Sequence, residues 1–230
     1  MDDDHYAAVW RRVSAAAAAG GPTLATACRA CADDLDADFA GATLVVAGEL
    51  RLIACATDER ARLAEDAQLV AGEGPCTEAY TKRVAVEVPD LNDAVTRWPV
   101  FAPIALQQGA RCVLAAPLII GDAHVGALDL YRCEPRPFTA AQKALATAYA
   151  RLLALLALDE HPRLLTSHSR PTSVGPQGYP PVVHMAAGVV AARYDLSPDD
   201  ALARLRAHAF SHDQTLSRTA QDVIESRRLD

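Results

Sequence analysis

Apolar residues near the start of the chain recur with the spacing of a helix. Gly21-Pro22 is a favourable helix start, since proline is tolerated in the first turn. The next apolar positions follow at intervals of four, three and four residues, which places them on one helical face. They are Leu24, Cys28, Cys31 and Leu35. The pattern therefore predicts an amphipathic helix that buries two of the six cysteines.

The middle of the chain contains short runs of β-branched and apolar residues bounded by Gly, Pro and Asp, which are typical of strands. The predicted strands are 43–46, 51–57, 84–88, 111–120 and 123–133. Gly121-Asp122 suits a type II′ hairpin turn between the last two strands. Residues 97–108 have the pattern of a helix that lies between strands. This order of elements predicts an α+β fold with an antiparallel sheet.

A long apolar helix is predicted after Phe138, where Thr139 and Gln142 have the spacing of a capping box. Its apolar residues extend well beyond one face. They are Leu145, Tyr149, Leu152, Leu153, Leu155, Leu156 and Leu158. Such a helix is either sandwiched within its domain or shared with a second chain.

The segment 161–181 contains five prolines, which fix the backbone and remove amide donors, so it is predicted to be a linker. It divides the chain into a domain of residues 1–160 and a tail of residues 182–230. The tail predicts three amphipathic helices. Ser197-Pro198 starts the second helix and Thr215 caps the third. Helices this short bury enough surface only as a bundle.

Composition and charge narrow the function. The chain is 51% apolar and 22% charged, as expected of a globular protein, and its net charge is −7. Nucleic-acid binding by so acidic a chain would need a local basic patch. The acidic start Met1-Asp2-Asp3-Asp4 does not resemble a signal peptide, and the apolar stretch 144–158 is too short to span a bilayer. We expect a cytoplasmic protein with reduced thiols and no membrane partner.

One set of residues in the tail has a characteristic order and spacing: Ala186-Ala187-Gly188, Arg193, Leu196-Ser197, Ala201-Leu202, Leu205-Arg206, Ala209, Leu216 and Ala220-Gln221-Asp222-Val223-Ile224. With these residues the tail resembles the ANTAR domain of transcription antiterminators. The resemblance implies a three-helix bundle that binds paired RNA hairpins in a leader transcript, usually as a homodimer. It identifies neither the target RNA nor the oligomeric state.

The first domain contains four short motifs: Gly72-Glu73-Gly74-Pro75-Cys76, Val88-Pro89-Asp90, Ala116-Pro117-Leu118 and Gly126-Ala127-Leu128. With these motifs it resembles a GAF domain, a sensor fold related to PAS. The resemblance implies a GAF/PAS-like antiparallel sheet with flanking helices that senses a small-molecule or protein signal. GAF domains share no ligand signature, so only Cys76 is a candidate ligand-binding residue.

Five side chains of the tail are candidate RNA-binding residues. Arg193 and Arg206 match positively charged positions of the ANTAR family, and helical phase adds Arg204, His208 and Arg218. An arginine pairs with phosphates and stacks on unpaired bases. Many relatives, however, have a lysine where this chain has Ala187, and the tail carries six arginines against seven acids. An alternative is therefore a dimerisation or protein-interaction module that binds no RNA.

A second alternative is enzymatic. Cys76 lies in a Gly-rich turn before a helix, where backbone N–H groups would lower its pKa, and GAF-type free methionine sulfoxide reductases place a cysteine in a similar turn. Cys112 is the candidate partner thiol. The rest of that family's cysteine-bearing loop is not visible in the chain, so no enzyme activity and no catalytic residue are expected.

The remaining motifs have structural interpretations. Cys28-x-x-Cys31 lies on the apolar helical face, the pair His208 and His212 falls at a helix end, and the aspartates of 33–38 indicate a helix end followed by a loop. No metal site and no cofactor are expected.

Overall fold

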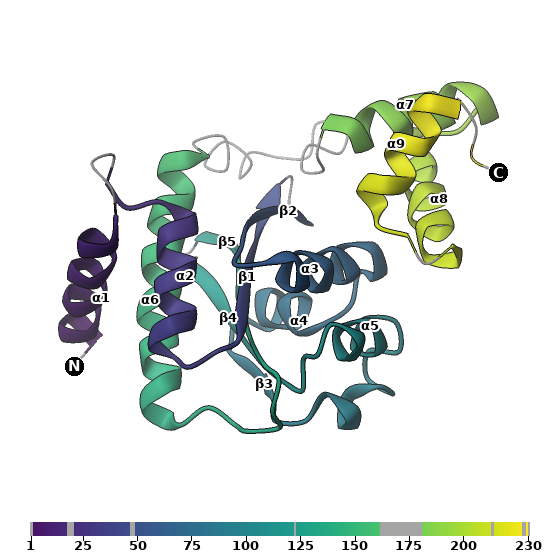
Figure 1. Ribbon diagram of the computed structural model, residues 1–230. Coiled ribbons are helices and arrows are strands. Elements are labelled where there is room, and N and C mark those ends of the chain that lie inside the picture. The colour runs from purple at the N-terminus through teal and green to yellow at the C-terminus, as the bar shows by residue number, and fades with distance from the viewer. Residues whose placement is uncertain are drawn as a thin grey trace.

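A five-stranded antiparallel sheet forms the centre of the first domain in the computed structural model, which describes residues 2–17, 21–46, 49–121, 123–161, 181–212, 214–226 and 229 (Figure 1). The strand order is β2-β1-β5-β4-β3. The strands are β1 (Phe39–Val46), β2 (Glu49–Ala56), β3 (Val86–Val88), β4 (Cys112–Ile120) and β5 (Ala123–Arg132). The predicted antiparallel α+β fold is confirmed.

Helices cover both faces of this sheet (Figure 1). One face is covered by α2 (Leu24–Asp34) and α6 (Ala140–Glu160), with α1 (Asp2–Ala16) packed outside them. The other face is covered by α3 (Glu59–Ala71), α4 (Pro75–Lys82) and α5 (Phe101–Gln107), with a short 3-10 turn, η1 (Leu91–Ala94), beside them. The domain therefore has two cores, one on each face of the sheet.

Alternation along β5 distributes its side chains between these cores. Leu128 and Leu130 lie in the core beneath α2 and α6, whereas Ala127 and Tyr131 lie in the core beneath α3 and α4. Because successive side chains of a strand point to opposite faces, Asp129 belongs to the same face as Ala127 and Tyr131. The strand thus carries an acidic side chain into a core.

The long apolar helix α6 is sandwiched within the domain, between α1 and the sheet. The predicted capping box at its start is present, with Thr139 accepting from the Gln142 amide. Of its leucines, Leu152 and Leu153 are completely buried, whereas Leu155 is 41% exposed. The width of the apolar surface is explained by contacts within the chain.

The predicted strands and the helix at 97–108 are present with shifted ends. That helix, α5, is shorter than predicted because residues 95–100 form turns around Pro99. Two helices were not predicted, α1 and α3. The helix expected after the Gly-rich turn is α4, which begins at Pro75 and therefore includes Cys76. In α3 the buried side chains include Glu65, Asp66 and Gln68, so the apolar periodicity that indicates a helix is interrupted. The predicted hairpin turn includes Asp122, which lies outside the described residues.

The tail forms three helices, α7 (Pro181–Tyr194), α8 (Pro198–Ser211) and α9 (Leu216–Ser226), around their own apolar core. Both predicted caps are present: Ser197 accepts from the Asp200 amide and Thr215 accepts from the Arg218 amide. Most of the predicted linker, residues 162–180, lies outside the described residues. Within the described part of the chain, no helix has the length and apolar character needed to cross a membrane.

Candidate functional site

The five candidate RNA-binding side chains of the tail have different surroundings. Arg193 is exposed in the last turn of α7. The exposed Arg204 guanidinium lies over the Tyr194 ring, 4.1 Å from its centroid. Arg218 forms an exposed ion pair with Asp222 at 3.1 Å. Arg193, Tyr194 and Arg204 therefore bring two guanidinium groups and an aromatic ring to the end of α7.

Arg206 faces the first domain instead of solvent. Its Nε donates a hydrogen bond of 2.9 Å to the carbonyl oxygen of Val70, near the end of α3. Gly72 ends α3 with a φ of +68°, and a Cβ at this position would lie 2.8 Å from Arg206 Nη2. Glycine thus both permits the left-handed helix end and lets the arginine approach.

A second hydrogen bond joins the two domains. The Asp66 side chain on α3 accepts from the backbone amide of Leu216, at the start of α9, over 3.2 Å. Burial raises the Asp66 pKa to about 6, and the Leu216 amide partly offsets this rise. We call Asp66, Val70, Arg206 and Leu216 the docking contact. It joins the sensor-like domain to two helices of the tail.

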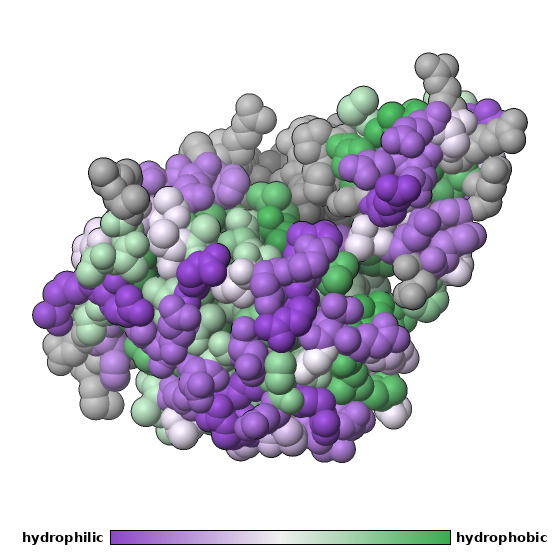
Figure 2. Space-filling view, in the orientation of Figure 1, coloured by the Kyte–Doolittle hydropathy of each residue, from purple (hydrophilic) through white to green (hydrophobic). Residues whose placement is uncertain are grey.

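A groove of about 370 Å³ lies beside the docking contact. Apolar residues reach the surface around α5 and toward the adjoining end of α8 (Figure 2). The groove is lined by Leu63, Asp66, Ala67, Val70, Pro99, Val100, Pro103, Ile104, Gln107, Gln108, Ala209, Phe210, Gln214 and Thr215. The two domains touch along α3 and leave this groove open where α5 faces α8.

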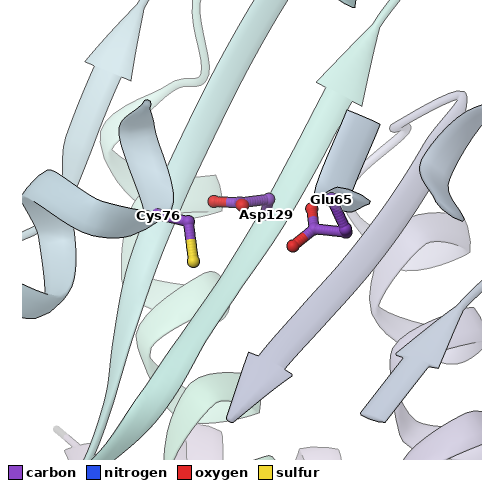
Figure 3. Close-up of side chains that lie close together, drawn as sticks. All are labelled: Glu65, Cys76 and Asp129. Atoms are coloured by element: carbon purple, nitrogen blue, oxygen red, sulfur yellow. The ribbon is translucent and has the colours of Figure 1, made fainter. Parts of the chain in front are cut away.

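A cluster of buried polar side chains lies on the inner side of α3. The ligand-type atoms of Glu65, Cys76 and Asp129 are all within 4.8 Å of one another, and the three residues are at most 1% exposed. Glu65 comes from α3, Cys76 from α4 and Asp129 from β5, with Asp129 between the other two (Figure 3). We call these three residues the buried triad.

Neutral donors hold the triad in place. The hydroxyl groups of Thr43 and Tyr131 donate to the two Glu65 oxygens over 2.7 and 3.0 Å. Gln68 Nε2 donates to Asp129 Oδ2 over 2.7 Å, and Gln68 Oε1 accepts from the Cys76 amide over 2.8 Å. The other oxygen, Asp129 Oδ1, is buried and receives no hydrogen bond from a donor outside the triad, although the Asp129 carboxyl lies in hydrogen-bond contact with Glu65 and Cys76.

Burial controls the protonation of the triad. Desolvation raises the pKa of Asp129 well above its ordinary value, and the neighbouring Glu65 charge raises it further. Desolvation also raises the pKa of Glu65 and that of the Cys76 thiol. The expectation that backbone N–H groups would lower the Cys76 pKa is therefore wrong, because burial outweighs them. This thiol is not an activated nucleophile in the described state.

Cys112 cannot serve as the partner thiol of Cys76 in this arrangement. Cys76 lies in the core under α3 and α4, whereas Cys112 lies in the core under α2 and α6. The sheet separates them. The geometry thus disfavours the thiol-reductase alternative.

The other motifs are found where the sequence indicated. Cys28 and Cys31 are buried in the core beneath α2 and α6. His212 ends α8, and its ring stacks on that of His208 with centroids 3.9 Å apart. The aspartates of 33–38 surround the end of α2, where Asp36 has a φ of +53°.

Sequence reasoning missed Glu65, Asp66 and Gln68 because it did not identify α3. Asp58 followed by a 13-residue segment free of Gly and Pro is a helix signal that was available, and the Asp58 side chain does cap α3. Cys76 was identified from its Gly-rich turn. Its proximity to Asp129, 53 positions further along, depends on the register of the sheet.

Comparison with known families agrees with this architecture. The GAF domain model matches residues 21–156, more than half of the chain, and the ANTAR domain model matches residues 181–224. No curated protein matches the chain.

Three solved structures illustrate the similarity. The GAF domain of an Acinetobacter phosphoenolpyruvate-protein phosphotransferase is 12% identical and has a TM-score of 0.49, covering 76% of this chain and 98% of that one. A type II free methionine-R-sulfoxide reductase from Thermoplasma acidophilum is 18% identical with a TM-score of 0.47, covering 68% and 96%. A GAF domain/HD domain protein from Geobacter sulfurreducens is 15% identical with a TM-score of 0.44, covering 59% and 90%.

The two matched regions correspond to the sheet domain and to the helical tail. The chain therefore belongs to the GAF family and carries a C-terminal ANTAR domain, the architecture of a GAF–ANTAR two-domain regulator.

Proposed function

We propose that this chain is a signal-responsive, RNA-binding transcription antitermination regulator that acts as a homodimer and has no enzyme activity. The observation that carries the proposal is the surface at the end of α7, within the ANTAR domain. There Arg193 is exposed and the Arg204 guanidinium stacks over the Tyr194 ring at 4.1 Å.

This surface has the chemistry that single-stranded RNA loops require. Unpaired bases stack on aromatic rings and on guanidinium planes, and arginine also pairs with phosphate oxygens. Because the whole chain has a net charge of −7, attraction to RNA must arise from such a local group of arginines. Arg218 on α9 adds a third exposed cation, although Asp222 neutralises part of its charge.

The docking contact supplies a route by which the GAF domain controls this output. In the docked arrangement Arg206 Nε donates to the Val70 carbonyl, which holds the guanidinium against the end of α3, so docking competes with its presentation to an RNA phosphate. We propose that RNA binding accompanies separation of the ANTAR domain from α3. A signal that favours the separated arrangement would then raise the affinity for RNA, and a signal that favours the docked arrangement would lower it.

The test is binding to a leader RNA with two tandem hairpins, measured by fluorescence anisotropy over a range of salt concentrations. We expect the double variant Arg193→Ala/Arg204→Ala to bind at least ~10-fold more weakly. The slope of log affinity against log salt concentration should also become shallower, by the amount that corresponds to about two lost phosphate contacts. The matched control is Arg29→Ala, an exposed arginine on α2. Equal affinity of wild type, control and double variant would overturn the proposed surface.

The second candidate function is protein interaction or dimerisation without RNA binding. It is favoured by two exposed apolar side chains on the tail helices, Met185 at 60% and Phe210 at 55% exposure. Light scattering of wild type and Met185→Ser/Phe210→Ser tests it. The second candidate would replace the first if the wild type is a dimer, the variant is a monomer, and the wild type shows no salt-dependent affinity for RNA.

A further inference from the structure

The buried triad has an unusual charge balance. Two carboxyl groups and a thiol share one enclosed site. They form hydrogen bonds with one another and with the neutral side chains of Thr43, Gln68 and Tyr131, and no cation is among their described partners. Burying ionised carboxylates without a cation is strongly unfavourable. The site must therefore either retain protons on these groups or bind a cation.

One atom of the triad points to a missing ligand. Asp129 is completely buried, yet its Oδ1 receives no hydrogen bond from a donor outside the triad. Buried polar atoms are nearly always paired in folded proteins, so an unpaired carboxylate oxygen needs an explanation. A carboxylate oxygen of Asp129 lies within 4.8 Å of the ligand atoms of Glu65 and Cys76. A cation among the three residues would satisfy it.

The surrounding side chains orient the ligands as metal sites require. Tyr131 and Thr43 hold the Glu65 carboxylate, and Gln68 holds Asp129 Oδ2 while it also accepts from the Cys76 amide. Such outer hydrogen bonds fix the orientation of ligating carboxylates. A Cβ at Gly41 would lie 2.6 Å from Glu65 Cγ, so only glycine leaves room for this side chain on β1.

We propose that Glu65, Cys76 and Asp129 form a binding site for one divalent transition-metal ion of the zinc type. A thiolate and two carboxylates suit zinc or its neighbours, whereas magnesium and calcium prefer sites made only of oxygen. Three protein ligands leave a fourth tetrahedral position for water or a signal molecule. Binding exchanges protons for metal: the Cys76 thiol proton and any carboxyl proton go to solvent while metal–sulfur and metal–oxygen bonds form.

The site has a direct mechanical connection to the docking contact. Glu65 and Asp66 are consecutive residues of α3, and Asp66 accepts the Leu216 amide of the ANTAR domain. A shift of α3 on metal binding would therefore reach the docking contact. Only the regulatory effect of metal binding on the docking contact rests on the proposed function; metal binding itself is independent of RNA.

The experiment uses the full chain after removal of metals by a chelator, titrated with zinc and with cobalt(II) as a spectroscopic probe. We expect one equivalent bound per chain and a thiolate-to-cobalt charge-transfer absorption. Cys76→Ser should abolish that absorption, and Asp129→Asn should weaken zinc binding by roughly 100-fold or more, beyond the loss expected for an outer hydrogen bond.

Two cysteine variants serve as matched controls. Cys133→Ser removes the exposed thiol and Cys112→Ser removes one on the opposite face of the sheet, so both should keep the absorption. Circular dichroism establishes that each variant is folded, and Glu65→Gln provides a second ligand variant. Absence of stoichiometric binding, or equal binding by wild type, Cys76→Ser and Asp129→Asn, would overturn the proposal. Because no RNA is present, failure here is distinguishable from failure of the proposed function.

Discussion

The two faces of the sheet in the GAF domain are built from different chemistry. The face beneath α2 and α6 is packed with Leu, Val, Ala and two cysteines of the CxxC motif. The face beneath α3 and α4 encloses Thr43, Glu65, Gln68 and Asp129 beside its apolar residues. Both faces are equally well buried. The difference is the one expected if one face provides stability and the other the proposed metal site, because buried carboxyl groups reduce stability unless a ligand compensates them.

Helix α3 connects the polar face to the ANTAR domain. Its inner side carries Glu65 and Gln68, and its outer side carries Asp66 and Val70, which accept hydrogen bonds from the tail. No comparable contact joins the described parts of α2 to the tail. Helix α3 therefore links the polar core directly to the ANTAR domain.

The largest expected effect is on the apolar face. Leu128→Ala should lower the free energy of unfolding by about 2–5 kcal/mol, because the removed side chain is completely buried and leaves a cavity. Urea denaturation followed by circular dichroism measures it. If the free energy of unfolding falls by less than about 1 kcal/mol, this face is loosely packed and the two faces of the sheet do not differ in their contribution to stability.

The two faces should also respond differently to the same substitution. Cys28→Ser buries a hydroxyl among apolar neighbours and should cost about 1–3 kcal/mol. Cys76→Ser keeps a polar atom beside the Asp129 carboxyl, with which the Cys76 side chain forms a hydrogen bond, so without metal it should cost less than about 1 kcal/mol. Urea denaturation of both variants in a chelator measures the difference. Equal losses would contradict the assignment of a polar site to the second face.

The apolar face was largely predictable from the sequence, and the polar face was not. Leu24, Cys28 and Leu35 reveal their helix by spacing alone, and the capping box of Thr139 locates α6. In α3, by contrast, Glu65 and Gln68 occupy inward positions where the pattern requires apolar residues. The inward polar side chains that form the proposed site therefore interrupt the apolar periodicity by which this helix would be predicted.

The placement of Arg206 shows a second limit of sequence reasoning. The family resemblance makes Arg206 a candidate RNA-binding residue, and its side chain does lie outside the tail's core. Which neighbour it meets depends on how two domains pack, about which the periodicity of one helix carries no information. Its contact with Val70 could be found only in three dimensions.

The docking contact gives a smaller expected effect. Arg206→Met retains the aliphatic stem but removes the donor to Val70, a change of about 1 kcal/mol in the docking equilibrium. Amide hydrogen exchange should become about fivefold faster in the last turn of α3 and stay unchanged in α2. Arg204→Met, which alters the stack on Tyr194 instead, is the matched control. Identical exchange in α3 for both variants would show that the contact does not restrain this helix.

The smallest expected change in stability comes from the residue at the centre of the polar face. In a chelator, Asp129→Asn should change the free energy of unfolding by less than about 1 kcal/mol, and in the stabilising direction. Burial and the neighbouring Glu65 disfavour a charged carboxyl at this position, and the amide of asparagine removes it. The amide keeps an acceptor for Gln68 and adds a donor toward Glu65.

A buried polar residue with a purely structural role should behave in the opposite way. The guanidinium of Arg132 donates to the carbonyl oxygens of Leu35, Asp36, Arg136 and Pro137 over 2.8–3.1 Å. Arg132→Met leaves these acceptors unpaired and should cost roughly 3 kcal/mol. If Asp129→Asn cost as much as Arg132→Met, the buried triad would be part of the scaffold. If Asp129→Asn leaves the free energy of unfolding unchanged while zinc affinity falls, Asp129 serves binding and not stability, as expected of a residue in a binding site.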